Sequence, residues 1–440
     1  MDKSPGKEHI AFTKWAISKG IEVNGVAPAR FPGRRLGMIA TKTIEVTKEG
    51  EIMLTVPQTA MLSIDSIPSS FVELFPSGTS IHGILAAYLT HGDPKTLKEL
   101  DAWRNVWPSW QELEASTPIL WPAHLRRSNS SFEEEDESRP SLLPPSISGL
   151  WNSFEKVPVG VDYDTRYQNM LAQEEKRLRH AWERVVTVFP ETEWKTFTYY
   201  WLIINSRSFY YVSPGKEAPE DWNDAIAMVP YADYFNHEDN AACEVRYDSI
   251  DYTFRTTRRY EKGEEVYMSY GPHSNDFLFI EYGFFLDKNE SDSIYLDDII
   301  FQDLTISDKK ELVHQDCFGN FELTPTGVSP SIETAACLKY MSKRDFRIYI
   351  EGRSKRAFDA EKSAEIIRGW IEVYLKETET TIKTITAMLG KLSTGDSEKW
   401  ERERLGMLLS RWGQIRELCE MAMEAVGRVS ELHCFEANGK

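Results

Sequence analysis

The stretch from Val229 to Phe285 constrains the fold most, because strand-like runs there alternate with polar turns. It begins VPYADYFNHEDNAACEV and ends with YEKGEEVYMSYGPHSNDFLFIEYGFF. Glu244–Tyr247 and Tyr252–Thr257 have the alternation of two hairpin strands. Lys262-Gly263 is a turn signal before another strand-like run, Glu265–Tyr270. The pattern predicts a small β unit that carries Asp, Asn and His in one turn and tyrosines at strand ends.

Helical patterns occupy most of the remaining chain. Apolar residues recur at helical spacing in 81–89, and longer helices are predicted over 162–189 and 193–211. Beyond about Asp297 the sequence is almost entirely helical, with two long amphipathic stretches at 366–389 and 405–418. A chain of 440 residues is too long for one ordinary core. We therefore expect a small β unit and a separate helical region.

The segment Ser128–Gly149 differs from its surroundings. It reads SNSSFEEEDESRPSLLPPSISG, with an acidic run followed by three prolines. Such a composition buries little apolar surface and is typical of a mobile, solvated loop. We expect a disordered acidic loop near 128–149.

Composition excludes several classes of protein. The formal net charge is −18, from 51 basic and 69 acidic residues. This disfavours nucleic acids and anionic membranes as partners, which attract a basic face, and it is compatible with a basic protein. The five cysteines form no CxxC pair, so we expect neither a metal site nor a disulfide framework. With no apolar leader or long apolar run, we expect a protein of the cytoplasm, the nucleus or both.

The candidate site residues are weak signals one by one. Arg207 is the only charge between Lys195 and Lys216. If it is buried it must face an anion, either a protein carboxylate or a ligand carboxylate or phosphate. An Asn-His pair in a turn is usually turn chemistry, and a tyrosine at a strand end is usually core packing. The sequence has no GxGxxG after a strand, P-loop, nucleophile elbow or HExxH.

The order of these motifs resembles the SET-domain protein methyltransferases, in particular the Rubisco large-subunit methyltransferase-like subgroup. RLGMIATKTI (Arg35–Ile44) is similar to the first motif of that family, although Arg35 stands at the first position of its usual Gly-x-Gly. SRSF (Ser206–Phe209) and DYFNH (Asp233–His237) resemble its Ser-Arg and Asp-x-x-Asn-His motifs. GEEVYMSYG (Gly263–Gly271) and SNDFLFIEYGF (Ser274–Phe284) resemble its last motif.

The resemblance implies S-adenosylmethionine as the cofactor. Arg34 and the backbone of Leu36 are then expected to contact it. Asn236 and His237 would hold it from the other side, the His largely through its backbone. Arg207 would face the methionine carboxylate, which gives its isolated charge a partner.

The resemblance also implies an acceptor side of the site. Tyr270 is expected to be the catalytic tyrosine and to contact the cofactor, and Tyr282 to line a lysine channel. Asp233 orients the turn or touches the substrate. Methyl transfer from a sulfonium to a neutral amine needs alignment of the reacting atoms and exclusion of water.

The expected fold is α+β: a SET-domain β-fold of small sheets with a helical insertion, plus an all-α C-terminal domain. The implied domains are the two SET parts at 8–62 and 229–290, the insertion at 63–228 and a substrate-binding helical domain at 297–432.

The expected function is S-adenosylmethionine-dependent protein-lysine N-methylation by a monomer. Its protein substrate would be a non-histone protein such as a ribosomal protein or translation factor. Protein-histidine methylation and a catalytically degenerate SET module that acts as a binding protein are the alternatives.

Overall fold

The computed structural model describes residues 4–31, 36–46, 50–126, 141–151, 167–393, 395 and 398–438. The chain divides into two compact units, which are described separately below. The first comprises Met1–Glu112 and Lys176–Pro272, and the second comprises Leu113–Glu175 and His273–Lys440. Each unit therefore combines segments that are far apart in the sequence.

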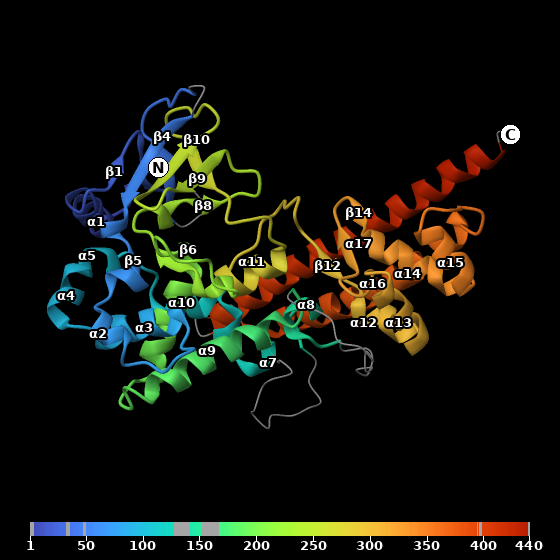
Figure 1. Cartoon of the computed structure of the whole chain (residues 1–440), viewed down its shortest axis with the longest axis horizontal. Coiled ribbons are helices and arrows are strands. Elements are labelled where there is room, and N and C mark those ends of the chain that lie inside the picture. The colour runs from blue at the N-terminus through green and yellow to red at the C-terminus, as the bar shows by residue number, and fades with distance from the viewer. Residues whose placement is uncertain are drawn as a thin grey trace. The chain divides into compact units, whose positions relative to one another are not determined.

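The first unit is built on three small sheets (Figure 1). The first has the order β1-β4-β10-β9, from Glu22–Val23, Glu51–Pro57, Asp251–Thr256 and Cys243–Tyr247. The second has the order β2-β3-β11-β8, from Val26–Arg30, Leu36–Ala40, Glu265–Met268 and Asn236–His237. The third has the order β5-β7-β6, from Leu62–Ser63, Ile226–Met228 and Ser208–Tyr210. The predicted hairpin is confirmed as β9 and β10, which pair antiparallel.

The first unit also contains several helices, most of them short. They are α1 (Lys7–Ser18), α2 (Ser69–Val72), α3 (Ile81–His91), α4 (Pro94–Glu99), α5 (Asp101–Arg104) and α10 (Trp194–Arg207), with single turns at Gln58–Ala60, Ile64–Ser66, Trp222–Asp224 and Ala232–Tyr234. Helix α3 packs on α10, and Leu85 and Ile203 of this pair are completely buried. Helices α6 (Trp110–Ser116) and α9 (Met170–Val186) cross the boundaries between the two units in the sequence.

Two of the expected helices have different bounds in the structure. The helix predicted over 193–211 ends at Arg207, because Ser208–Tyr210 leaves it to pair with β7. The backbone hydrogen bonds of that pairing replace those that a longer helix would make. The helix predicted over 162–189 is α9, which begins only at Met170. Its expected first residues, 162–166, lie outside the described part of the chain.

The second unit is mainly helical, and the expectation of a helical C-terminal region is confirmed. The elements after α11 (Asn275–Tyr282) are α12 (Asp297–Asp303), α13 (Ile306–His314), α14 (Pro330–Tyr340), α15 (Lys343–Ile350), α16 (Ala360–Lys391) and α17 (Lys399–Asn438), with a small sheet of β12 (Ile294–Tyr295), β13 (Glu322–Thr324) and β14 (Gly327–Val328). The long helices α16 and α17 pack on each other. Earlier segments add η3 (Pro118–Leu120), α7 (Ala123–Arg126) and α8 (Pro145–Ser148).

Part of the predicted acidic loop is buried in the second unit. Residues 127–140 lie outside the described chain, but 141–148 are all buried and contain α8. Leu142, Leu143 and Ile147 are at most 2% exposed. For these residues the expectation of a solvated loop is wrong, because the acidic and proline-rich composition masks a short apolar anchor.

No helix among the described residues is both long enough and apolar enough to cross a membrane.

The second sheet brings three distant segments within hydrogen-bond distance. Strand β8 pairs parallel with β11, and β11 pairs antiparallel with β3. The Asn236 amide nitrogen donates to the Leu36 carbonyl at 3.1 Å and to Glu265 Oε1 at 2.8 Å. This carboxamide therefore joins the segments at residues 36, 236 and 265.

Gly37 leaves the space that this contact requires. A Cβ atom at Gly37 would lie 2.6 Å from both Asn236 Nδ2 and Glu265 Oε1. Real Cβ atoms do not approach other heavy atoms so closely, so one of the hydrogen-bonded groups would have to move. The glycine is therefore required here by the close approach of the Asn236 side chain.

Gly37→Ala tests this packing. We expect it to destabilise the protein by about 1–3 kcal/mol, as overpacking of a buried site does. Gly369→Ala is the matched control, because Gly369 is exposed in α16 and a Cβ there meets nothing within 4 Å. The control should be more stable than the wild type by about 0.5–1 kcal/mol, since alanine favours a helix interior. Urea denaturation of both variants measures the difference, and equal stability of the two would contradict the packing argument.

Candidate active site

The turn before β8 starts from a strained residue. Tyr231 has a φ of 74°, and its side chain is completely buried. A non-glycine residue in that region costs of order 1–3 kcal/mol, which surrounding packing must offset. The Tyr231 ring packs on Phe12 and Tyr234, and its hydroxyl lies 3.5 Å from Thr13 Oγ1. The single turn η5 (Ala232–Tyr234) follows and leads into β8.

Tyr270 lies against the turn from the opposite strand. It comes two residues after β11, and its backbone N–H donates to His237 Nδ1 at 3.0 Å. The two rings stack with centroids 5.0 Å apart. A backbone N–H can only donate, so His237 Nδ1 is the lone-pair nitrogen and its proton is on Nε2. The Tyr270 hydroxyl donates to the Phe235 carbonyl at 2.8 Å.

The Tyr270 hydroxyl is held in its protonated form. Removal from water raises its pKa above the ordinary value of 10, and the charge of Asp233 adds to this. The positive charge of Arg207 lowers this pKa, but by less than burial raises it. At neutral pH this hydroxyl therefore donates to the Phe235 carbonyl and still has lone pairs to accept a hydrogen bond.

Asp233 is a carboxylate in an environment that disfavours its charge. Its pKa is raised, because desolvation outweighs the nearby Arg207 charge, the Trp103 N–H and the backbone N–H groups of the turn. Trp103 Nε1, from α5, donates to Asp233 Oδ2 at 3.3 Å. Asp233 Oδ1 is buried and accepts no hydrogen bond from any residue in the described ranges. This oxygen is a free acceptor inside the site.

Arg207 is the last residue of helix α10. Its side chain is half-buried, although the apolar sequence around it would suggest complete burial. Its guanidinium donates to Ser206 Oγ at 2.8 Å. Its charge lowers the pKa values of both Asp233 and Tyr270, although burial outweighs this effect in each.

The structure gathers most of the predicted site residues in the first unit. They are Leu36, Arg207, Asp233, Asn236, His237 and Tyr270. Arg34 lies outside the described residues, as does Arg35. Tyr282 belongs to the second unit and is the last residue of helix α11. The run FLFIEY is apolar except for Glu281, and such a short run does not distinguish a helix from a strand.

Trp103, Glu265 and Phe235 are contacts of the site that were not among the predicted site residues. Glu265 lies within the last motif, between Gly263 and Tyr270. Successive side chains of a strand point to opposite faces, so the apolar Val266 beside it could have indicated that Glu265 points away from the face that carries Val266. Phe235 contributes only its carbonyl, which no side-chain pattern reveals. Trp103 meets Asp233 across 130 residues of sequence, and nothing local predicts that pairing.

The donor set suits organic ligands of both charges and not a metal ion. Arg207 matches a ligand carboxylate, such as that of S-adenosylmethionine. The buried Asp233 Oδ1 matches a cationic amine. Across the described residues, no group of three or more His, Cys, Asp or Glu could hold a metal.

Known proteins are similar to this chain in both sequence and fold. Ribosomal lysine N-methyltransferase set11 of Schizosaccharomyces pombe is 35% identical over 177 residues, which are 38% of this chain and 45% of that protein. Ribosomal lysine N-methyltransferase 2 of Saccharomyces cerevisiae is 29% identical over 313 residues, 66% of this chain and 62% of that protein. SET domain-containing protein 4 of Homo sapiens is 25% identical over 319 residues, 70% and 66% of the two chains. The matches thus span 45% to 66% of these relatives.

Solved structures extend the similarity over nearly the whole chain. The structure of Rubisco LSMT bound to sinefungin and monomethyllysine has a TM-score of 0.59 at 16% identity, and covers 98% of this chain and 93% of that one. Another structure of Rubisco LSMT, bound to AdoMet, has a TM-score of 0.54 at 15% identity, with coverage of 98% and 93%. At such identities the likeness concerns the fold, and it agrees with the expected small sheets and helical segments.

A model of one protein family covers the strands and the insertion around the site. Its description is "SET domain", and it matches residues 35–271, more than half of the 440 residues. The match includes Leu36 at one end and Tyr270 at the other. This chain belongs to the SET-domain family.

Proposed function

We propose that this protein is an S-adenosylmethionine-dependent protein-lysine N-methyltransferase. The observation that carries the proposal is the neutral Tyr270 hydroxyl, fixed on the Phe235 carbonyl next to Asn236 and His237. Two similar proteins are named ribosomal lysine N-methyltransferases, and a protein of similar fold is bound to AdoMet. The cofactor would supply a methyl group on a sulfonium, an electrophile that needs no metal.

The cofactor side of the proposed site lies along β3 and β8. The backbone of Leu36 and of the Asn236-His237 pair would contact the cofactor, and Arg207 its carboxylate, with Arg34 and Tyr270 as further expected contacts. The Asn236 side chain is already used between Leu36 and Glu265, so its role is to fix these backbones. Groups fixed before binding lose little entropy when the ligand arrives.

The acceptor side is centred on Tyr270. Its hydroxyl proton is committed to the Phe235 carbonyl, so its oxygen can accept an N–H from a lysine amine. That contact orients the nitrogen lone pair towards the methyl group. The amine must be neutral to attack, and both desolvation and a nearby sulfonium lower a lysine pKa. Because Tyr270 stays protonated, it positions the amine and does not serve as the base.

Asp233 and Tyr282 complete the proposed acceptor side. The free oxygen of Asp233 would receive the ammonium form of the lysine on entry. Tyr282 is half-buried and is proposed to line the channel for the lysine side chain.

A basic protein substrate suits the charge of this chain. The net charge of −18 favours encounter with a positively charged partner. Many ribosomal proteins are basic, and translation factors are the other proposed substrates. The proposed enzyme is a monomer of the cytoplasm, the nucleus or both. The proposed arrangement keeps two SET parts (8–62 and 229–290), the insertion at 63–228 and a substrate-binding helical domain at 297–432.

Labelled methyl transfer into lysate from a strain that lacks the protein, followed by sequencing of the labelled peptide, distinguishes lysine from histidine acceptors.

Asp233→Asn separates stability from activity. The raised pKa of Asp233 means that the native state holds its proton more tightly than the unfolded chain, whose Asp pKa is about 4. Wild-type stability should therefore fall as the pH rises from about 4 through the folded pKa, and this fall should be absent in the variant. We expect the variant to be at least as stable as the wild type at pH 7 but to transfer methyl groups more slowly. Denaturation curves at several pH values test this, and a less stable variant at pH 7 would show that attraction to Arg207 dominates.

Tyr270→Phe removes only the hydroxyl that orients the amine. We expect kcat to fall by about 10²–10³-fold, as when another preorganised polar contact is lost, with cofactor affinity nearly unchanged. Tyr234→Phe is the control, because it removes a buried hydroxyl that contacts His9 at 2.8 Å. Radiolabelled methyl transfer and calorimetric titration give the two quantities. Comparable turnover of Tyr270→Phe and wild type would remove Tyr270 from its proposed role.

Arg207→Ala should weaken S-adenosylmethionine binding. A charge-assisted hydrogen bond contributes about 1.5–3 kcal/mol, so Kd should rise by about one to two orders of magnitude. Arg104→Ala is the control, since Arg104 is also half-buried in the first unit but contacts Tyr200 and Asp101. Calorimetric titration compares the three proteins. An unchanged Kd with lowered stability would make Arg207 a structural partner of Asp233, and no binding by the wild type would reject the enzymatic proposal.

A further inference from the structure

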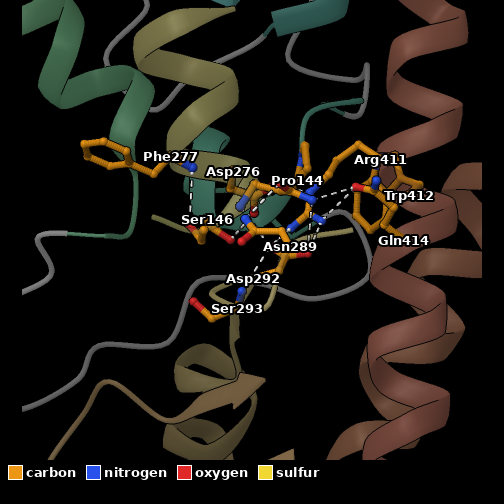
Figure 2. A network of polar contacts seen from close by, with 12 residues as sticks. Pro144, Ser146, Asp276, Phe277, Asn289, Asp292, Ser293, Arg411, Trp412 and Gln414 are labelled. Atoms are coloured by element: carbon orange, nitrogen blue, oxygen red, sulfur yellow. Dashed lines mark hydrogen bonds and ion pairs between the residues drawn. The ribbon is translucent and has the colours of Figure 1, made fainter. Parts of the chain in front are cut away.

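Helix α11 in the second unit begins at a buried cluster of charges (Figure 2). Its centre is Arg411 of α17, which is completely buried and contacts Asp276 of α11 and Asp292. We call these three residues the Arg411 cluster. Asp276 is also completely buried, and Asp292 is 4% exposed. Buried charges are costly unless each is paired, so this arrangement leaves little freedom to its members.

The guanidinium uses three of its N–H groups on the two carboxylates. Arg411 Nε donates to Asp276 Oδ1 at 2.7 Å. Nη1 and Nη2 donate to the two oxygens of Asp292 at 2.7 and 3.1 Å. This is the paired, planar recognition that an arginine makes and a lysine does not. The geometry therefore fixes both direction and distance between α17 and α11.

Neighbouring groups complete the hydrogen bonding of the cluster. Ser146 of α8 donates to Asp276 Oδ2 at 2.7 Å, so both oxygens of Asp276 are engaged. The Asn275 backbone donates to Asp292 Oδ1 at 2.9 Å, and its side chain donates to Gln414 at 3.0 Å. Figure 2 shows these contacts converging on the first turn of α11 from three separate segments. The start of the helix is therefore held on several sides.

The other end of α11 is held by close packing. Gly283 follows Tyr282 with a φ of 76°, and a Cβ there would lie 2.9 Å from Ser116 Oγ. In the middle of the helix, Phe279 packs edge-on against Trp121 at 5.4 Å between centroids. Both ends of the helix are therefore in contact with other segments of the unit. Its last residue, Tyr282, takes its place from these contacts.

The cluster contains two carboxylates and one cation. Burial raises the pKa of Asp276 despite the Arg411 charge beside it. Loss of the guanidinium would leave both carboxylates buried without their main partner, and the first turn of α11 would have to rearrange to reach water. A change at Arg411 is thus transmitted to the first turn of α11.

We propose that Arg411 is a positioning residue for Tyr282, acting through α11 on the place of the Tyr282 hydroxyl. The inference rests on the proposed methyltransferase function, in which Tyr282 lines the lysine channel. It assigns a role in the reaction to a completely buried residue of α17, which acts through another side chain.

Arg411→Lys is the primary variant, because it keeps the positive charge and removes the planar geometry. Arg347→Lys is the matched control, since Arg347 donates to both oxygens of Glu311 at 2.6 Å in the same unit. We expect Arg411→Lys to lower kcat/KM for the protein substrate by about tenfold, in keeping with the cost of misplaced groups. The Kd for S-adenosylmethionine should not change, and amide hydrogen exchange over 275–283 should accelerate. Arg347→Lys should alter none of these.

A double-mutant cycle with Tyr282→Phe distinguishes positioning from general destabilisation. If Arg411 acts through Tyr282, then Arg411→Lys should cost less than about twofold in the Tyr282→Phe background, because coupled sites are not additive. Additive effects would overturn the proposal, as would an Arg411→Lys protein with normal kcat/KM. If Arg411→Lys does not fold, Asp276→Asn replaces it with the same expectations, because it keeps the shape of the side chain.

The same measurements separate this inference from the proposed function. A wild type that transfers no methyl group to any protein would reject the function. Normal hydrogen exchange over 275–283 in Arg411→Lys would reject the positioning role even if the enzyme is active.

Discussion

One carboxamide group, that of Asn236, sets the geometry on which the rest of the site depends. Its nitrogen has two protons, and they are shared between a backbone carbonyl from residue 36 and a carboxylate from residue 265. The strands that carry these groups lie 200 and 29 residues away in the sequence. A hydroxyl, thiol or apolar side chain in place of Asn236 could not make both contacts. The constraint explains why a glycine stands opposite it.

The site combines rigid backbone with unfavourable electrostatics. Tyr231 adopts a φ that a tyrosine rarely adopts, and Asp233 is a carboxylate whose charge is disfavoured. Both features cost free energy in the folded state, and both lie within the one turn that precedes Asn236. Such costs are tolerated where the surroundings determine the conformation and where a ligand relieves them. Packing around the Tyr231 ring meets the first condition, and a cationic ligand group at Asp233 Oδ1 would meet the second.

Local pattern predicts the elements whose burial is periodic. The hairpin of β9 and β10 and the long helices α16 and α17 follow from alternation and from helical spacing, because one face of each is buried over its full length. Motif order predicts that Leu36, Asn236, His237 and Tyr270 come together, since each motif occupies a strand end or a turn. The periodicity itself carries no information about which strands are neighbours.

The remaining features depend on contacts between distant residues. Helix α10 ends at Arg207 because β7 supplies a partner strand, although its apolar residues continue. The segment 141–148 is buried because it reaches an apolar region beneath α17, where Trp412 Nε1 donates to the Leu142 carbonyl. Helix α11 could not be predicted from its sequence, because its mainly apolar residues would also suit a strand. In each case tertiary contacts decide between local alternatives of similar free energy.

The Arg411 cluster also has a consequence for folding during synthesis on the ribosome. All residues of the first unit have been synthesised at residue 272. Asp292 of the second unit pairs with Arg411, which is synthesised 119 residues later. At synthesis rates of roughly 5–20 residues per second, that interval is about 6–24 s. During it, α11 and the segment at Ser146 have no guanidinium to join them. Maturation of the second unit therefore requires α17, whereas the residues of the first unit are all synthesised by residue 272.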